Sequence, residues 1–127
     1  VARTLESMFI IGAKLFLKRP NPWSVAQWEI YEDEALQKVT AEQSLSSLKK
    51  ALEAEACDSR IADTSLMITP HYERKLTKAI ITNFHQPKST LLLLISSFLG
   101  EHWHEVYKHA LDHEYRFLSY GDSNLYL

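Results

Sequence analysis

The segment from Asn83 to Thr90 holds most of the side chains in this sequence that could take part in chemistry. Between a β-branched run and a long apolar run it places an amide, an imidazole, an ammonium group and two hydroxyls: Asn83, His85, Lys88, Ser89 and Thr90. An imidazole titrates near neutral pH, so His85 is the best candidate here for a general acid or base. Lys88 would suit an anion beside the start of a helix, where free backbone N–H groups gather.

The two flanking runs predict the elements that hold this segment. Ile80–Thr82 has the β-branched composition of a buried strand. Leu91–Leu99 predicts an apolar helix, which Gly100 can end in the left-handed conformation. A strand, a polar loop and a helix N-terminus in this order form an arrangement in which α/β proteins often bind ligands.

Hydrophobic periodicity and capping signals predict the remaining elements. Helices are expected over Val1–Leu17, Thr40–Cys57 and Glu101–Glu114, and strands over Ser65–Thr69 and within Tyr115–Leu127. Thr40 and Gln43 have the spacing of a capping box, which marks the start of the second helix. The order of these elements predicts an α/β fold: one layered domain over residues 1–127, with about four helices packed on a short mixed sheet.

Composition and charge narrow the class of protein. The 127 residues suit one domain, and the net charge of −2 gives no basic field of the kind that attracts nucleic acid. The single Cys57, expected as a small buried residue, excludes an internal disulfide and fits a reducing compartment. Leu91–Leu99 is far shorter than the roughly 20 residues of a membrane span, and no signal peptide is visible. The sequence therefore predicts a cytoplasmic protein without a membrane partner.

Two further patterns have a structural and a functional interpretation. His109 and His113 have the i, i+4 spacing of a metal pair, but a zinc site needs three or four converging ligands, so no metal is expected. Trp23, Trp28 and Tyr31 would cap the edge of a core. Alternatively they could stack on nucleic-acid bases, although the acidic residues around them would repel phosphate.

Four short blocks carry a resemblance to a known family. They are Arg3–Ser7, Thr82–His85, the run of residues 87–92, and the late pair Tyr115–Phe117 with Ser119–Asp122. Together these blocks resemble the S-adenosylmethionine:tRNA ribosyltransferase-isomerases of queuosine biosynthesis. The sequence departs from the family pattern at His71, where the family usually has Gly, and at Lys78-Ala79, where it has an acidic residue and Gly.

The resemblance implies an enzyme and its substrates. Enzymes of this family transfer the ribosyl group of S-adenosylmethionine to the 7-aminomethyl-7-deazaguanine base of tRNA, forming epoxyqueuosine and releasing adenine and methionine. Family members are much longer and have a β-rich part upstream. The chain is therefore expected to be the C-terminal part of a two-domain enzyme, inactive without the N-terminal part. The sequence does not predict an oligomeric state.

The resemblance also supports the positions of the site residues, and the chemistry of each side chain suggests its role. Catalytic roles are expected for three residues and substrate contacts for seven: His85, Asp122 and Tyr120, and Arg3, Glu6, Asn83, Lys88, Ser89, Thr90 and Arg116. Structural alternatives exist for several of them. Arg3 and Glu6 could form a surface ion pair, Asn83 and Asp122 could satisfy buried backbone groups, and Ser89 or Thr90 could cap a helix.

The two departures motivate a different class of function. Glycine at the position of His71 would tolerate a positive φ that strains histidine, so a changed turn is expected if the fold needs that conformation. A relative that has lost catalysis could act as an RNA- or protein-binding module, and a plain structural domain is a third possibility. The intact Asn83, His85, Lys88 and Asp122 favour the enzyme.

Overall fold

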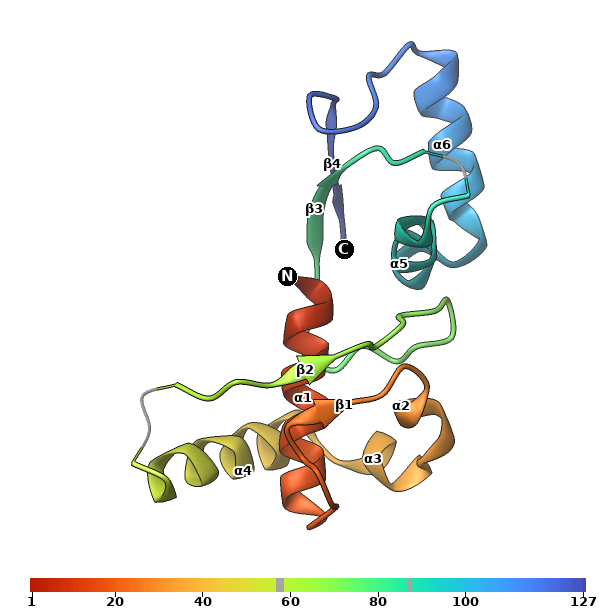
Figure 1. The fold of residues 1–127 in the computed structure, drawn as a ribbon. Helices are drawn as coiled ribbons and strands as arrows, with labels where there is room; N and C mark the ends of the chain where they lie inside the picture. Colours follow the sequence, from red (N-terminus) through yellow and green to blue (C-terminus); the bar gives the residue numbers. More distant parts are fainter. Residues whose placement is uncertain (57–58, 87) are drawn as a thin grey trace. The chain divides into compact units, whose positions relative to one another are not determined.

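The computed structural model describes residues 1–56, 59–86 and 88–127 (Figure 1). These residues form two compact units, each of which is described by itself. The first unit comprises Val1–Met67 with Glu73–Thr77, and the second comprises Ile68–Tyr72 with Lys78–Leu127. The prediction of one domain over residues 1–127 stays a prediction. Cys57, expected to be a buried residue, and Pro87 of the third sequence block lie outside the described residues.

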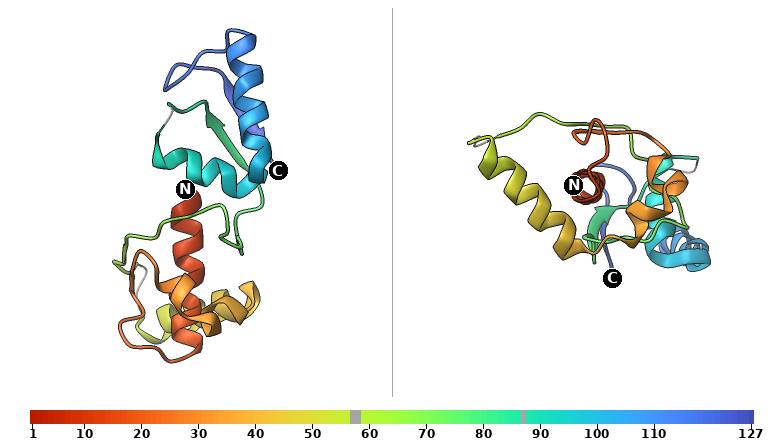
Figure 2. Two further views of the ribbon diagram at one scale, coloured as in Figure 1. Left: turned by 90° about the vertical axis from the view of Figure 1, so that its right-hand side faces the viewer. Right: turned by 90° about the horizontal axis from the view of Figure 1, so that it is seen from below.

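Two long helices dominate the first unit: α1 (Ala2–Phe16) packs against α4 (Ala41–Ala54) (Figures 1 and 2). The expected capping box begins α4, because Thr40 Oγ1 accepts from the backbone N of Gln43 at 3.1 Å and Gln43 Oε1 accepts from the backbone N of Thr40 at 3.0 Å. The predictions of helices over Val1–Leu17 and Thr40–Cys57 are thus confirmed, and the observed ends lie within three residues of those expected.

The two helices approach most closely at Gly12. A Cβ at this position would lie 2.3 Å from both the carbonyl oxygen and the Oγ of Ser44. The same serine is fully buried and donates a hydrogen bond from Oγ to the carbonyl oxygen of Phe9 at 2.7 Å. Glycine on one helix and a small hydroxyl on the other therefore set the distance between α1 and α4.

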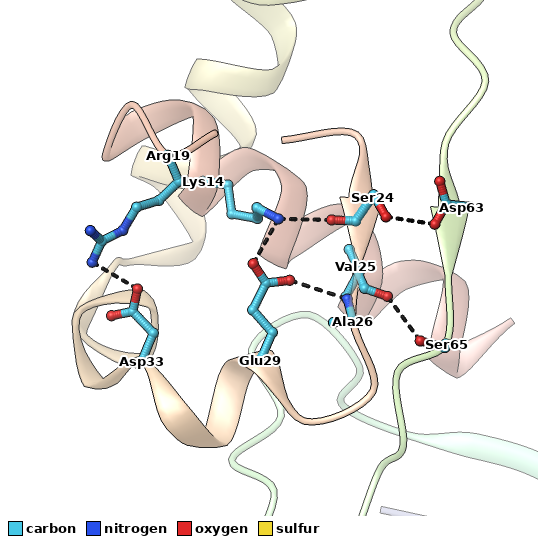
Figure 3. A network of polar contacts seen from close by, with 9 residues as sticks. All are labelled: Lys14, Arg19, Ser24, Val25, Ala26, Glu29, Asp33, Asp63 and Ser65. Atoms are coloured by element: carbon cyan, nitrogen blue, oxygen red, sulfur yellow. Dashed lines mark hydrogen bonds and ion pairs between the residues drawn. The ribbon is translucent and has the colours of Figure 1, made fainter. Parts of the chain in front are cut away.

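A polar network joins α1 to the segment of residues 21–38, for which the sequence predicts no single element (Figure 3). This segment contains β1 (Ser24–Val25), α2 (Glu29–Glu32) and α3 (Glu34–Lys38). Lys14, only 4% exposed, lies 2.7 Å from Glu29 Oε1 and donates to the carbonyl oxygen of Ser24 at 2.8 Å. The buried ammonium group is thus paired and hydrogen-bonded, as a buried charge must be.

The strand pair of the first unit is parallel: β1 lies beside β2 (Asp63–Thr64). The prediction of a strand over Ser65–Thr69 is wrong. Beyond β2 only alternate N–H groups continue the pairing, from Ser65 to the carbonyl oxygen of Val25 and from Met67 to that of Gln27. The partner segment then enters α2 at Glu29, which leaves residues 68 and 69 without a neighbouring strand on this side.

The second unit places two helices on one face of an antiparallel strand pair (Figures 1 and 2). β3 (Ile80–Asn83) pairs with β4 (Ser123–Tyr126), so that Ile80 lies opposite Tyr126 and Asn83 opposite Ser123. The helices are α5 (Thr90–Leu99) and α6 (Trp103–Asp112), joined by the 3₁₀ turn η1 (Gly100–His102). Strands and helices share one core, made of Phe84, Ile95, Tyr107, Ala110 and Tyr126.

Short sequence signals in the second unit predict helix ends that the structure largely confirms. Gly100 follows α5 with a φ of 57°, as expected for a glycine that ends a helix. The helix expected over Glu101–Glu114 begins instead with the turn η1. The backbone at His71 is not strained in the way considered above, because the φ of this residue is not positive.

The predicted fold class is confirmed, with one difference in the sheet. The described residues form helices and short strands of both orientations, as a mixed α/β fold requires. In place of one mixed sheet, however, they form two separate pairs, β1–β2 and β3–β4. Within the described ranges, no helix combines the length and the apolar character that a membrane crossing needs.

The close approach at Gly12 generates the first testable prediction. Gly12→Ala should lower the free energy of unfolding by about 1–3 kcal/mol, although alanine favours a helix, because the new methyl group forces α4 away from α1. Urea denaturation followed by the fluorescence of Trp23 and Trp28, both in the first unit, measures this change. Ser46→Ala on the exposed side of α4 is the control, and an equal midpoint for the two variants would contradict the prediction.

Candidate functional site

His85 lies just beyond β3, held at its side chain and its backbone. Its Nε2 lies 3.0 Å from Thr82 Oγ1, and its backbone N–H donates to the hydroxyl oxygen of Tyr107 at 3.1 Å. Burial lowers the pKa of His85 below the ordinary value of 6.5. The imidazole is therefore neutral at neutral pH, which is the state that a proton acceptor needs.

Asn83 connects β3 to the 116–122 loop, the segment from Arg116 to Asp122. Its Nδ2 donates to the carbonyl oxygen of Leu118 at 2.7 Å, and its Oδ1 accepts from Ser123 Oγ at 3.1 Å. The backbone N–H of Leu118 donates in turn to the carbonyl oxygen of Phe84 at 2.9 Å. The amide of Asn83 is thus engaged by the protein itself.

Asp122 closes the same loop. Its Oδ2 accepts from the backbone N of Arg116 at 2.7 Å, and its own backbone N–H donates to the carbonyl oxygen of Arg116 at 2.9 Å. The hydrogen bond from the Arg116 backbone, together with the charge of its guanidinium, lowers the pKa of Asp122 below its ordinary value. Asp122 is consequently a carboxylate at neutral pH and binds the start of the loop.

These contacts bring two sequence blocks together. Thr82–His85 and Tyr115–Asp122 are at least 30 positions apart in the sequence. They nevertheless meet through Asn83, through the bond between Leu118 and Phe84, and through a bridge between Phe84 and Phe117. Asn83 and Asp122 do bind backbone groups, as their structural alternative holds, but these bonds are exposed rather than buried. Tyr120, at 94% exposure, projects from the loop.

The start of α5 uses one of its two hydroxyls as a cap. Ser89 Oγ accepts from the backbone N of Leu91 at 3.2 Å, so Ser89 is the N-cap that the sequence allowed. Thr90 is the exposed first residue of the helix. Lys88 is exposed and has a φ of 62°, a strained conformation for a side chain of this size.

Arg3 and Glu6 lie in the first unit, on α1, whereas the other eight predicted site residues lie in the second. Glu6 is fully buried, and the surface ion pair considered for it is therefore wrong. Its Oε1 accepts from the backbone N–H groups of Leu76 and Thr77 at 3.1 and 2.7 Å, and its Oε2 accepts from that of Lys75 at 3.0 Å. Arg3 is exposed.

Sequence reasoning missed Thr82 and Tyr107, the two partners of His85. Thr82 precedes His85 by three residues, and this spacing could have suggested a contact. No local signal points to Tyr107, which lies on a different helix and whose pKa is raised by burial and lowered to a lesser extent by the bond from His85.

The two other patterns that the sequence raised have structural counterparts. His109 and His113 stack at 3.9 Å, and His113 Nδ1 lies 2.8 Å from the carbonyl oxygen of His109. Across the described part of the chain, no three His, Cys, Asp or Glu residues are grouped as metal ligands. The ring centroids of Trp28 and Tyr31 lie 5.8 Å apart, and the Arg60 guanidinium lies 5.1 Å from the ring centroid of Trp23.

Comparison with known proteins bears out the resemblance. A family model described as "Queuosine biosynthesis protein" matches residues 37–126. The S-adenosylmethionine:tRNA ribosyltransferase-isomerase of Polynucleobacter necessarius subsp. necessarius is 47% identical over 76 residues, which are 58% of this chain and 22% of that protein. The enzyme of the same name from Paraburkholderia phytofirmans is 45% identical over 86 residues, which are 60% of this chain and 24% of that protein.

A solved structure is also similar. The crystal structure of S-adenosylmethionine tRNA ribosyltransferase from Thermotoga maritima matches with a TM-score of 0.51 and 39% identity. The match covers 65% of this chain and 31% of that one. The chain spans less than a quarter of the length of the two curated relatives.

The buried carboxylate of Glu6 generates a prediction for the first unit. Glu6→Gln should lower the free energy of unfolding by at least about 2 kcal/mol. An NH₂ group then replaces one of the two acceptor oxygens, and the negative charge that strengthens the bonds to residues 75–77 is lost. Urea denaturation measures the change. Glu42→Gln, the same substitution at an exposed position of α4, should have almost no effect. Equal losses in the two variants would disprove the role of Glu6.

A second prediction compares two buried tyrosines in the core of the second unit. Tyr107 accepts the backbone N–H of His85, whereas the hydroxyl of Tyr126 has no partner among the described residues, and burial with the charge of Tyr107 raises its pKa to about 12. Tyr107→Phe should cost about 1 kcal/mol of stability, and Tyr126→Phe should cost nothing or stabilise.

Urea denaturation followed by Trp103 fluorescence, in the same unit, compares the two phenylalanine variants. Each removes one hydroxyl from the same core, so each serves as the control for the other. A larger loss of stability for Tyr126→Phe than for Tyr107→Phe would refute the assignment of their hydrogen bonds.

Proposed function

Since this chain belongs to the queuosine biosynthesis protein family, we propose that it supplies part of the active site of an S-adenosylmethionine-dependent tRNA ribosyltransferase-isomerase. In the proposed reaction the ribosyl group of S-adenosylmethionine moves to the 7-aminomethyl-7-deazaguanine base of tRNA. Epoxyqueuosine forms, and adenine and methionine leave. The partners that this reaction requires are tRNA and the further polypeptide present in the longer relatives, and the proposed location is cytoplasmic.

The observation that carries the proposal is the meeting of two sequence blocks in the second unit. Thr82–His85 and Tyr115–Asp122 both lie within the matched residues 37–126, and the matching relatives bear the name of this enzyme. Asn83 and the backbone of Leu118 join the blocks beside His85. His85, with a partly buried neutral imidazole, thus directly follows the two residues that bind the exposed loop. We take this as a suitable setting for proton transfer to or from a bound substrate.

His85 is the proposed catalytic residue of this part of the site. Attack on the ribosyl group of a sulfonium substrate requires removal of protons, and His85 is available as the base because its pKa is lowered. The contact with Thr82 Oγ1 fixes the ring orientation. A base whose pKa lies below 6.5 stays competent as the pH falls to that value, and it is lost only at lower pH.

The exposed polar residues are the proposed substrate contacts. The ammonium group of Lys88 would meet the methionyl carboxylate or a tRNA phosphate, and the remaining exposed candidates are Thr90, Arg116 and Arg3. Four predicted residues bind backbone groups and are proposed to act by positioning their segments: Glu6, Asn83, Ser89 and Asp122.

A chimera tests the function. This chain would replace the matching segment of the Paraburkholderia phytofirmans relative, and adenine release from S-adenosylmethionine would be measured with tRNA that carries the aminomethyl-deazaguanine base. The chimera should be active, and His85→Ala should lower kcat by about 10²- to 10⁴-fold, the usual contribution of a general acid or base. The acid limb of the kcat/KM profile should lie below pH 6.5 because of the lowered pKa of His85.

The control is His102→Ala, an exposed histidine in η1 that should leave kcat unchanged. An inactive chimera that is folded and binds tRNA would favour a binding module over the enzyme. An active chimera in which His85→Ala keeps full kcat would remove the catalytic role of His85 while leaving the enzyme assignment intact.

A further inference from the structure

The 116–122 loop is fixed in place although it lies at the surface. Asp122 binds the Arg116 backbone at both N and O, and the N–H of Gly121 donates to the carbonyl oxygen of Leu118 at 2.9 Å. From outside the loop, the Asn83 amide and the carbonyl oxygen of Phe84 bind the same leucine. Hydrogen bonds within the loop and from β3 therefore hold its backbone in this conformation.

This conformation is also costly to adopt. Leu118 has a φ of 70°, which is unfavourable for a side chain with a Cβ. At Gly121 an added Cβ would lie 2.3 Å from the carbonyl oxygen of Arg116, so only glycine fits. Phe117 of the loop packs against Phe84 and Tyr107 in the core, but Leu118 is 47% exposed and Tyr120 is 94% exposed. A strained residue that gains little burial of its own, such as Leu118, is characteristic of functional segments.

The feature that the loop presents is the ring of Tyr120. An exposed tyrosine ring offers a flat apolar face, and any nucleobase can stack on such a face whatever its identity. A stacking residue gives most affinity when its position is fixed before binding. The hydrogen bonds made by Asn83 and Asp122 supply this fixed position.

We propose that the 116–122 loop is a preformed platform on which Tyr120 stacks against a nucleobase ring of a substrate, with Asn83 and Asp122 as positioning residues. The inference rests on the proposed function, which offers two sources of such a ring: the adenine of S-adenosylmethionine and a base of tRNA. In this assignment Tyr120 binds rather than reacts, which differs from the catalytic role expected from the sequence.

Kinetics of the chimera with three variants test the role of the ring. Tyr120→Ala and Tyr120→Leu should raise the KM for one substrate by roughly 5- to 150-fold, the effect of losing one stacked base, whereas Tyr120→Phe should stay near the original value. A rise for S-adenosylmethionine identifies adenine, and a rise for tRNA identifies a tRNA base. Unchanged KM values, or an equal loss in the phenylalanine variant, would overturn the proposal.

The positioning role has its own readout. Asp122→Ala should raise the KM for the same substrate as Tyr120→Ala, and the double variant should be no worse than Tyr120→Ala alone, because the two residues act through one contact. If Asp122 were merely structural, its effect would instead add to that of Tyr120→Ala and would extend to the KM of both substrates.

A binding experiment separates this inference from the proposed function. The 127-residue chain, carrying ¹³C-labelled tyrosine rings, would be titrated with S-adenosylmethionine and, separately, with an anticodon stem-loop RNA. The resonance of Tyr120, assigned by its loss in Tyr120→Phe, should shift with one ligand while that of the buried Tyr126 stays in place. A shift with an inactive chimera would support the platform without the enzyme. No shift with either ligand would refute the platform, whatever the chimera does.

Discussion

The carboxylate of Glu6 is the constraint on which the first unit depends. It is removed from water and accepts three consecutive backbone N–H groups from residues about 70 positions away, Lys75 to Thr77. Without this acceptor, α1 would bury a loop whose donors have no partner. Ser7 and Lys14 extend the arrangement, since Ser7 bonds to Thr64 at 2.7 Å and Lys14 to Glu29 and Ser24. A helix with an apolar pattern thus organises its unit through polar groups.

The fold could be predicted where its cause is local. The capping box at Thr40, the cap at Ser89 and the left-handed Gly100 each depend on residues within a few positions, so the sequence indicates them directly. The buried state of Glu6 and Lys14 could not be predicted in this way. Their partners are fixed only when distant segments meet, and a charged residue in an apolar helix otherwise indicates an exposed position. The misplaced strand at Ser65–Thr69 has the same origin, because its length is set by the partner segment.

The candidate site divides along similar lines. Eight of the predicted site residues lie in the second unit, where hydrogen bonds join Asn83 and Phe84 to the 116–122 loop that Asp122 closes. Which group each of these side chains binds could not be predicted from the sequence, because an amide or a carboxylate can bind a substrate or a backbone group equally well. At Asn83 and Asp122 backbone groups take these positions. Tyr107 had no signal at all, since its contact with His85 arises from the packing of α6 on the strand pair.

The pairing of β3 with β4 has a consequence for the order of folding. Ile80 pairs with Tyr126, so this pair closes a loop that contains both helices of the second unit. Closing so long a loop costs entropy before any contact repays it, and such non-local pairing slows folding. During synthesis on the ribosome, the core around Phe84 and Ile95 can therefore form only after Tyr126 has been synthesised. The contact between α1 and α4 can form much earlier.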